Sequence, residues 1–324
     1  MRSVELSSPD KLLFPDDGIT KADLAEYYQR VSRWMLPHVK GRPVSMQRFP
    51  GGIRGKGFFH KDAPEHFPAW IRRVEVPKAG GTLQHVYTSG ADTLVYLVGQ
   101  NTITPHVWLS RADRLTQPDR LVFDLDPPPG RDFASVRRAA RATGELVREL
   151  GLTPFAQVTG SKGIHVWAPL RRRAHHDEVR ELARRAAQVL AERHPGELTT
   201  EFRKGKRDGR ILVDVLRNNY AQTTVPPYAV RPRPGAPVAT PIEWDELSDS
   251  KLRPDRWTLR NVLRRLTASG DPWADMQSHA RGIARARAVG RAAALRHALV
   301  RRAAGLRARL RGLSALPAPP GSRR

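Results

Sequence analysis

Two aspartates at the end of an apolar run, Asp124 and Asp126, are the residues best suited to chemistry. The run LVFDLDPPPG, residues 121–130, begins as a buried strand and stops at three prolines. Because side chains alternate along a strand, both carboxylates lie on one face. Neighbouring carboxylates repel unless a cation lies between them, and their oxygens favour Mg²⁺, Mn²⁺ or Ca²⁺. The pair predicts a metal site, with an aspartate that caps a proline loop as the alternative.

The elements that follow predict how a third carboxylate reaches this pair. Hydrophobic periodicity indicates an α+β fold in the order β-α-β-β-α-β. The expected strands are 121–126, 154–158, 163–168 and 211–216, and the expected helices are 132–150 and 176–193. In this split arrangement the last strand lies beside the first, which would place Asp214 next to Asp124 and Asp126. Three carboxylates on one sheet face favour a metal more strongly than two.

A glycine-rich turn, TGSKGIH at residues 159–165, joins the two middle strands. Its hydroxyls, lysine and exposed amides are the chemistry of a phosphate cradle. A plain hairpin turn would explain the glycines but not the lysine and the histidine that follows. After the last strand, a proline-dense segment carries Arg217, Asn218, Arg231 and Arg233. We expect it to wrap over the surface in extended form, with its arginines either solvated or bound to phosphate.

The N-terminal part is predicted to be less regular. Residues 1–20 read as a loop, and Thr20 with Asp23 predicts a capping box that starts a helix, which Pro37 is expected to end. Strands are expected at 42–49, 71–76, 83–87, 93–98 and 103–109. The last strand carries His106, and a lone histidine is usually structural.

Two N-terminal features suit a DNA end. Lys11 and Lys21 flank a helix N-terminus, which makes a phosphate seat, although solvated surface lysines are the simpler interpretation. The glycine-rich basic insert at 50–70 contains Phe58 and Phe59, which suit stacking on exposed bases. The alternative is a loop that tucks its aromatic side chains into a small core of its own.

The composition restricts the function classes. The 324 residues, 40% of them hydrophobic, suffice for one large domain or two modest ones. A net charge of +24 favours polyanions, nucleic acid first and anionic membrane second, and residues 203–210, RKGKRDGR, form a basic loop. The absence of cysteine excludes disulfides, thiolate zinc sites and cysteine nucleophiles. Without a long apolar run or a signal peptide core, we expect a soluble, cytoplasmic, nucleoid-associated protein.

An Arg/Ala-rich tail is expected at 271–324. From residue 273 onward it contains 12 Arg, no Lys and one acidic residue. Five of its leucines fall near one helical face: Leu295, Leu299, Leu306, Leu310 and Leu313. The pattern is compatible with a helix that docks on the body, a DNA-binding arm or a partly disordered tail.

Taken in order, LVFDLDPP, TGSKGIHVW and LVDVLRNN resemble the three motifs of the archaeo-eukaryotic primase superfamily, and in particular the polymerase domain of bacterial ligase D. The similarity extends over roughly residues 5–270, including PDKLLFP and GITKADLAEYY. It implies a primase-polymerase domain at 1–270, with an N-terminal α/β part at 1–115 and a catalytic core at 116–270. Because no ligase nucleotidylation motif or nuclease segment is found, we expect a stand-alone polymerase module.

The resemblance implies a two-metal nucleotidyl transferase that adds NTPs or dNTPs to DNA ends and gaps during non-homologous end joining. The two ions, Mn²⁺ or Mg²⁺, would be held by Asp124, Asp126 and Asp214. The incoming triphosphate would contact His106, Thr159, Ser161, Lys162, His165 and Arg231. Lys11 and Lys21 would bind the 5′-phosphate of a gap, and Phe58 and Phe59 would stack against the template or downstream end. The implied partners are gapped DNA, Ku and a separate ATP-dependent ligase.

Other functions stay open at this point. Asp-x-Asp also opens aspartate-nucleophile phosphatases and marks nucleotide-sugar glycosyltransferases, but three prolines and the β-α-β-β-α-β order disfavour the phosphatases. A second alternative is a module that bridges DNA ends without catalysis, and a third is a primase that acts outside end joining. The motifs are shared, so they choose neither between NTPs and dNTPs nor between a primase and a gap-filling role.

Overall fold

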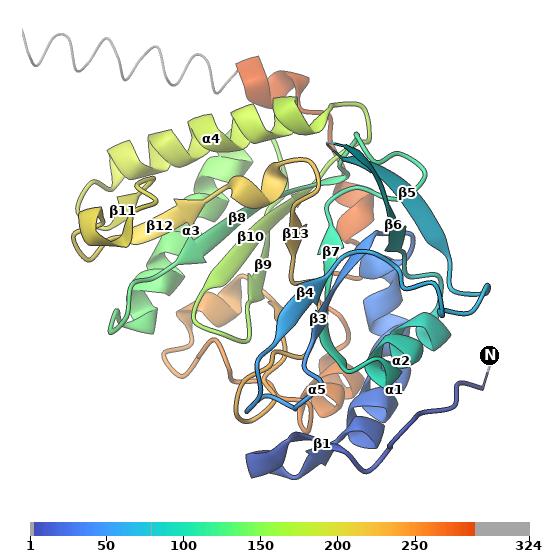
Figure 1. Ribbon diagram of the computed structural model, residues 1–324. Helices are drawn as coiled ribbons and strands as arrows, with labels where there is room; N and C mark the ends of the chain where they lie inside the picture. The colour runs from blue at the N-terminus through green and yellow to red at the C-terminus, as the bar shows by residue number, and fades with distance from the viewer. Residues whose placement is uncertain (1–2, 79, 289–324) are drawn as a thin grey trace, which may run out of the picture.

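A computed structural model describes residues 3–78 and 80–288 (Figure 1). Two main sheets form the body. The first has six strands in the order β11-β12-β8-β10-β9-β14, and the second has four in the order β13-β7-β3-β4. Two further two-stranded sheets, β1-β2 and β5-β6, belong to the N-terminal part.

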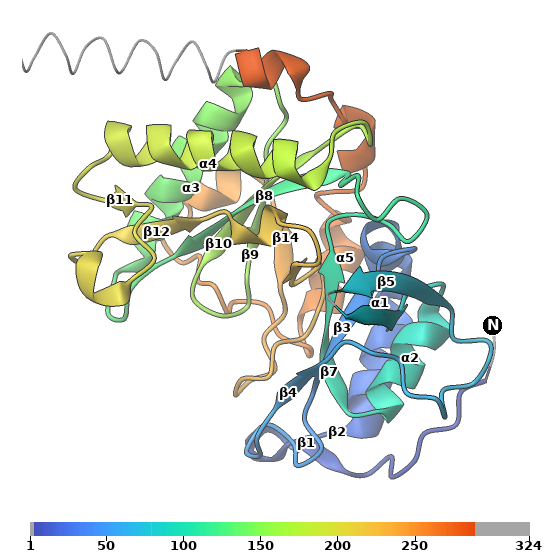
Figure 2. The ribbon, with the colours of Figure 1, turned by 45° about the horizontal axis from the view of Figure 1, so that its top comes forward.

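The six-stranded sheet contains the predicted β-α-β-β-α-β unit. Its strands are β8 (Arg120–Asp126), β9 (Phe155–Val158), β10 (Ile164–Pro169), β11 (Leu198–Thr199), β12 (Ile211–Asp214) and β14 (Thr240–Ile242). Two helices, α3 (Phe133–Glu149) and α4 (His176–Arg193), cover one face of it (Figure 2). Strand β12 pairs antiparallel with β8, so the prediction that the last strand lies beside the first is confirmed. At the sheet edges, β11 spans two residues and β14 contains Pro241.

Alternation along β8 separates the core from a polar face. Leu121, Phe123 and Leu125 are fully buried in the core that α3 and α4 share. Asp124 and Asp126 alternate with these residues and therefore project from the opposite face, where they are partly exposed. The apolar residues anchor the strand, so the two carboxylates are held on a well-packed backbone.

The N-terminal part is built on the four-stranded sheet. Its strands are β3 (Val44–Arg48), β4 (Phe58–His60), β7 (Thr102–Trp108) and β13 (Thr223–Thr224). Its helices are α1 (Lys21–Val39) and α2 (Ala91–Gly99), and its hairpins are β1 (Leu12–Phe14) with β2 (Ile19–Thr20) and β5 (Arg73–Lys78) with β6 (Gly81–Val86). The stretch expected as a loop at 1–20 therefore contains the β1–β2 hairpin.

Two expectations for this part are wrong. Residues 93–98 belong to helix α2 and not to a strand, because α2 packs against both α1 and β7 and is apolar nearly all round. A short apolar run of this kind does not distinguish a buried helix from a buried strand. The insert at 50–70 is not one flexible loop either, since β4 pairs with β3 through Phe58, Phe59 and His60.

Helix α1 starts as predicted but ends later. Thr20 and Asp23 form the expected capping box. Pro37 lies inside the helix, which continues to Val39. A proline near the end of a helix removes one N–H and breaks nothing beyond its own turn. The buried face of α1 bonds both β7, through Tyr28, and the buried segment after β12, through Tyr27.

The proline-dense segment after β12 does not wrap over the surface as expected. Tyr228, Ala229 and Val230 are fully buried, and so are Val238 and Ala239. Their backbone groups pair with each other: the Tyr228 N–H donates to the Ala239 carbonyl at 2.6 Å, and the Ala239 N–H donates to the Ala229 carbonyl at 2.9 Å. Local pairing satisfies the buried backbone in spite of the prolines.

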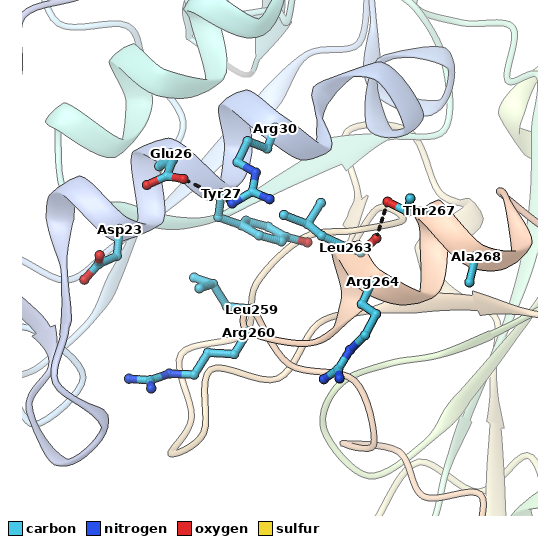
Figure 3. A pocket seen from close by; sticks show the side chains of 10 residues that line it. All are labelled: Asp23, Glu26, Tyr27, Arg30, Leu259, Arg260, Leu263, Arg264, Thr267 and Ala268. Atoms are coloured by element: carbon cyan, nitrogen blue, oxygen red, sulfur yellow. Dashed lines mark hydrogen bonds and ion pairs between the residues drawn. The ribbon is translucent and has the colours of Figure 1, made fainter.

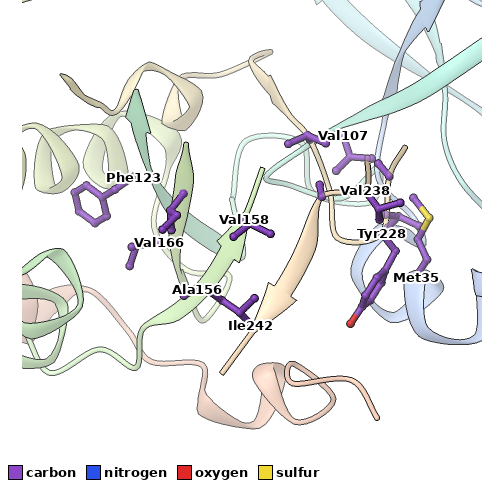
Figure 4. Close-up of a cluster of buried hydrophobic side chains, with 14 of the residues drawn as sticks. Met35, Val107, Phe123, Ala156, Val158, Val166, Tyr228, Val238 and Ile242 are labelled. Carbon is purple, nitrogen blue, oxygen red and sulfur yellow. The ribbon is translucent and has the colours of Figure 1, made fainter. Parts of the chain in front are cut away.

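One core joins the two parts. In Figure 4 it extends from Phe123 and Val166 on the six-stranded sheet, through Val238, to Tyr228 and to Met35 of α1. A short helix, α5 (Val262–Ser269), follows β14. Beyond it, Asp271 accepts a hydrogen bond from the Tyr228 hydroxyl at 2.5 Å, which holds the segment after α5 against this core.

Within the described residues, no helix is long and apolar enough to cross a membrane. The leucines of the tail, from Leu295 to Leu313, lie outside the described residues. The described part of the predicted tail ends at Ala288. Within this part, Trp273, Met276 and Ile283 are buried against the body of the protein.

Candidate active site

Three carboxylates meet on the exposed face of the six-stranded sheet. Asp124 and Asp214 are direct cross-strand partners in the pairing of β8 with β12, and Asp126 lies two residues further along β8. Burial raises the pKa of Asp214, and the negative charges of Asp124 and Asp126 raise it further against an opposing hydrogen bond from the Leu216 N–H. The raised pKa marks a place where an added positive charge would be stabilising.

Two basic side chains hold Asp126. Lys162 Nζ lies 2.9 Å from one carboxylate oxygen, and Arg207 Nη1 donates to the other at 3.1 Å. Arg207 is buried and comes from the basic loop at 203–210, in which no motif distinguishes it from the other basic residues. Bonds from its guanidinium to loop carbonyls fix its direction, and that loop conformation has no signature in the residue pattern.

Basic side chains from three segments lie around Asp124. His165 Nε2 lies 3.4 Å from one of its oxygens, and Arg217 Nε lies 3.7 Å from the other. Burial on its own would raise the pKa of Asp124, but His165, Arg217 and Arg231 together hold that pKa below its ordinary value. Adjacent carboxylates on β8 and β12 are therefore shifted in opposite directions, which is typical of functional sites.

These groups open onto a cavity of about 140 Å³ at the junction of the two main sheets. Its lining includes both aspartates of β8 and Arg217. It also includes every residue that the resemblance assigned to the triphosphate: His106, Thr159, Ser161, Lys162, His165 and Arg231. The structure thus brings together residues from four separate segments of the chain around one small polar space.

The glycine turn shapes one wall of this cavity. A Cβ atom at Gly160 would lie 2.8 Å from Arg231 Cγ, and one at Gly163 would lie 2.3 Å from the Leu125 carbonyl oxygen. Both positions therefore require glycine. The Thr159 hydroxyl accepts the Gly163 N–H at 3.2 Å, so it closes the turn. The hydroxyl predicted to grip phosphate is engaged within the turn itself.

His106 and Arg231 form the opposite wall. Burial lowers the pKa of Arg231 to about 10, and Asp124 opposes that shift. Among the described residues Arg231 Nε has no hydrogen-bond partner. Burial, followed by the charges of Arg231 and Arg217, lowers the pKa of His106 well below its ordinary value. His106 is consequently a neutral hydrogen-bonding group, with Nε2 3.1 Å from Gln47 Oε1.

The donor set suits a divalent cation in its chemistry, because all three groups offer carboxylate oxygens. Within residues 3–78 and 80–288, however, no three Asp, Glu or His side chains already stand close enough together to hold a metal ion. Lys162 and Arg207 occupy the oxygens of Asp126 instead. A cation bound there would substitute for positive charge that these two side chains now supply.

The residues predicted to contact DNA lie outside the cavity. Burial, and then the charge of Lys11, lowers the pKa of Lys21, whose Nζ donates to the Ser7 carbonyl at 2.8 Å. The two lysines are therefore close together, and Lys21 is buried where a surface lysine was the alternative. Phe58 and Phe59 are exposed, and the Phe59 ring stands edge-on 5.1 Å from His106. Phe59 thus borders the cavity, whereas Phe58, its neighbour on β4, points to the other face of the sheet.

A larger groove of about 640 Å³ lies between α1 and α5 (Figure 3). It is lined by Arg30, Arg260, Arg264 and Tyr27, among others, and contains none of the three site aspartates. Arg30 pairs with Glu26, and two leucines form part of the lining. Its volume exceeds that of the carboxylate cavity, but of these two cavities only the smaller one contains the aspartates of β8 and the residues of the glycine turn.

Comparison with known proteins gives consistent similarities. Residues 20–273 match the family model described as LigD, primase-polymerase domain. The chain is 34% identical over 279 residues to the multifunctional non-homologous end joining protein LigD of Mycolicibacterium smegmatis, covering 86% of this chain and 36% of that protein. It is 30% identical over 273 residues to the bifunctional non-homologous end joining protein LigD of Bacillus subtilis, covering 84% and 44%. The chain therefore spans less than half the length of these relatives.

The fold is also similar to a solved structure, the polymerase domain from Mycobacterium tuberculosis Ligase D in complex with DNA. The TM-score is 0.81 at 33% sequence identity, with 86% of this chain and 100% of that chain covered.

Proposed function

The chain belongs to the LigD primase-polymerase domain family, a family of metal-dependent nucleotidyltransferases, and we propose that it adds NTPs or dNTPs to DNA ends and gaps opposite a template strand. One observation carries the proposal: strand register sets Asp214 opposite Asp124, beside a cavity lined by Lys162 and Arg231. Nucleotidyl transfer needs oxygen ligands for cations next to a seat for a triphosphate. Both requirements meet at this one place.

We assign Asp124, Asp126 and Asp214 as ligands of two divalent cations, Mn²⁺ or Mg²⁺. Ions bound there would lower the pKa of the attacking 3′-hydroxyl and neutralise charge on the departing pyrophosphate. Asp214 has the raised pKa of the three, so it gains most from a nearby positive charge. Asp124 already has a lowered pKa and is ready to bind a cation as a carboxylate.

The incoming triphosphate is proposed to occupy the cavity between its two walls. Lys162 and Arg231 supply positive charge, and the neutral His106 supplies a hydrogen bond without adding charge. Ser161, Thr159 and His165 complete the seat from the side of the glycine turn. Lys162 would exchange its contact with Asp126 for one with phosphate. Phosphoryl transfer depends mainly on such positioning and charge neutralisation.

The DNA end is proposed to lie across the N-terminal part. Lys11 and Lys21 would bind the 5′-phosphate at a gap, and Phe58 and Phe59 would stack on an exposed base at the mouth of the cavity. The net charge of +24 supports backbone binding without sequence choice and predicts a steep dependence on salt. The DNA complex of the similar polymerase domain supports this assignment.

We further propose that this activity serves non-homologous end joining, as the names of the relatives suggest, in a nucleoid-associated protein that works with Ku and a separate ATP-dependent ligase. In this proposal residues 1–270 form the polymerase domain, divided into an N-terminal part at 1–115 and a catalytic core at 116–270. A protein that bridges DNA ends without catalysis is the main alternative.

The test offers the protein a 5′-phosphorylated gapped duplex with NTPs or dNTPs and with Mn²⁺ or Mg²⁺. We expect extension by the native chain and none by the double variant Asp124→Ala/Asp126→Ala, while both bind the duplex. Asp208→Ala, which removes an exposed acidic residue of the neighbouring loop, is the matched control and should extend normally. Binding without extension by the native chain under every condition would instead support the bridging function.

A further inference from the structure

One wall of the nucleotide cavity is built from two segments that lie far apart in the sequence. His106 belongs to β7, and Arg231 follows the buried segment 228–230. Behind them lies Tyr28 of α1, buried to 1% exposure. Its hydroxyl donates to the Ile103 carbonyl of β7 at 2.7 Å and accepts the Val230 N–H at 3.1 Å.

We propose that Tyr28 is a positioning residue for nucleotide binding, because its hydroxyl fixes the strand that carries His106 against the segment that carries Arg231. Ile103 lies three residues before His106, and Val230 directly precedes Arg231. One oxygen atom therefore sets the separation of the two backbones whose side chains form one wall of the cavity. This role rests on the proposed function, since the cavity is taken to bind a nucleotide.

A second bond ties the same two segments. The Thr104 hydroxyl of β7 donates to the Val230 carbonyl at 2.5 Å. Side chains thus hold both polar groups of the Val230 backbone, one from α1 and one from β7. Arg231 then pairs its own N–H with the Pro237 carbonyl at 2.7 Å, so its backbone is fixed on both sides.

The side chain of Arg231 has little freedom beyond this clamp. Its Cγ fills the space in which Gly160 lacks a Cβ atom, so the glycine turn limits movement in that direction. The charge of Arg231 acts on Tyr28, which places the guanidinium near the phenol. Burial raises the pKa of Tyr28, and the hydroxyl therefore stays protonated and can donate and accept at once.

The neighbouring Tyr27 provides a matched control. It is equally buried on α1, and its hydroxyl donates to the Tyr228 carbonyl at 2.8 Å. That bond joins α1 to the segment three residues before Arg231, but it does not join β7 to that segment. Phenylalanine at either position keeps the ring in the core and removes one hydroxyl, so the cost in stability should be similar.

The experiment compares Tyr28→Phe, Tyr27→Phe and Thr104→Val in the full chain by nucleotide addition on the gapped duplex, with thermal unfolding in parallel. A lost hydrogen bond of ordinary strength corresponds to about a fivefold effect. We expect Tyr28→Phe to raise the KM for the nucleotide about fivefold with kcat nearly unchanged. Tyr27→Phe should lower Tm as much as Tyr28→Phe does, but should leave KM unchanged. Thr104→Val should raise KM in the same direction as Tyr28→Phe.

Equal KM values for Tyr28→Phe and the native chain would overturn the inference, as would equal increases for Tyr28→Phe and Tyr27→Phe. If Tyr28→Phe does not fold, Thr104→Val against Tyr27→Phe decides the question by the same criterion. A native chain that adds no nucleotide at all would overturn the proposed function itself. That result differs from an active native chain whose KM is unchanged by Tyr28→Phe, which would overturn only the role of Tyr28.

Discussion

The two main sheets contribute unlike surfaces to the site. On the six-stranded sheet, Asp124 and Asp126 sit on a strand anchored in the core, and each is matched by a basic partner. On the four-stranded sheet, Phe58 and Phe59 sit on a three-residue strand and are exposed. We propose that the six-stranded sheet holds the reacting groups and that the four-stranded sheet receives the DNA end. Substitutions should therefore separate rate from end binding.

The largest effect is expected for Asp126→Asn. Losing one ligand of a catalytic cation removes several kcal/mol of transition-state stabilisation, so kcat should fall about 10³-fold. Affinity for gapped DNA should stay the same, because Asp126 lines the cavity and is not one of the residues proposed to bind the DNA end. Single-turnover extension and a parallel binding assay measure the two quantities. A large loss of DNA affinity in this variant would contradict the proposed division of roles between the two sheets.

A smaller effect is expected for the double variant Phe58→Ala/Phe59→Ala. Stacking contributes about 1–3 kcal/mol per base, so affinity for gapped duplex should fall roughly tenfold or more while kcat at saturating DNA is kept. Phe202→Ala is a suitable control, because Phe202 is as exposed as Phe59 but follows the other sheet. An equal loss of affinity in the control would show that exposed aromatic area in general, and not this pair, binds the DNA end.

Lys11→Gln should change selectivity more than affinity. We expect the preference for a 5′-phosphorylated gap over an unphosphorylated one to fall about fivefold, since one solvent-accessible ion pair of up to about 1 kcal/mol is lost. The salt dependence of binding should also weaken by about one phosphate contact. Lys11 is the better choice than Lys21, whose buried ammonium also bonds backbone carbonyls. Lys40→Gln, at the far end of α1, should leave the preference intact.

The smallest effect concerns pH. Asp214 must lose its proton to bind a cation, and its pKa is raised, so activity should fall as the pH falls through a value above the ordinary aspartate range. Asp124, with a lowered pKa, stays ionised in that window. A higher concentration of divalent cation should move this limb of the pH profile to lower pH, because proton and cation compete. If the acidic limb of the pH profile does not move with cation concentration, the titrating group is not Asp214.

The same contrast separates what the sequence predicts well from what it predicts poorly. Helix α4 begins and ends where its periodicity predicts, and the β-α-β-β-α-β order correctly puts Asp214 beside Asp124. These features depend on local periodicity and a common topology. In the N-terminal part the run at 93–98 has no periodicity of its own, and neighbours far away in sequence decide that it is a helix.

Within the site, most of the predicted residues belong to short motifs with a chemical purpose, whereas His106 and Arg231 were assigned only through the resemblance. The ones that were missed act through long-range geometry. Arg207 reaches Asp126 only through the fold of its loop, and Tyr28 meets Val230 across 202 positions of the chain. No local pattern encodes either contact, since both depend on how complete elements are docked.

The edges of the six-stranded sheet have a consequence for the behaviour of many copies at once. Unpaired edge strands are templates for pairing with other chains and so for aggregation, above all where copies of a protein are crowded. Here one edge strand, β11, is two residues long, and the other, β14, contains Pro241, which has no N–H to offer an incoming strand. The edges of this sheet therefore offer few free backbone groups to which a strand of another copy could hydrogen-bond.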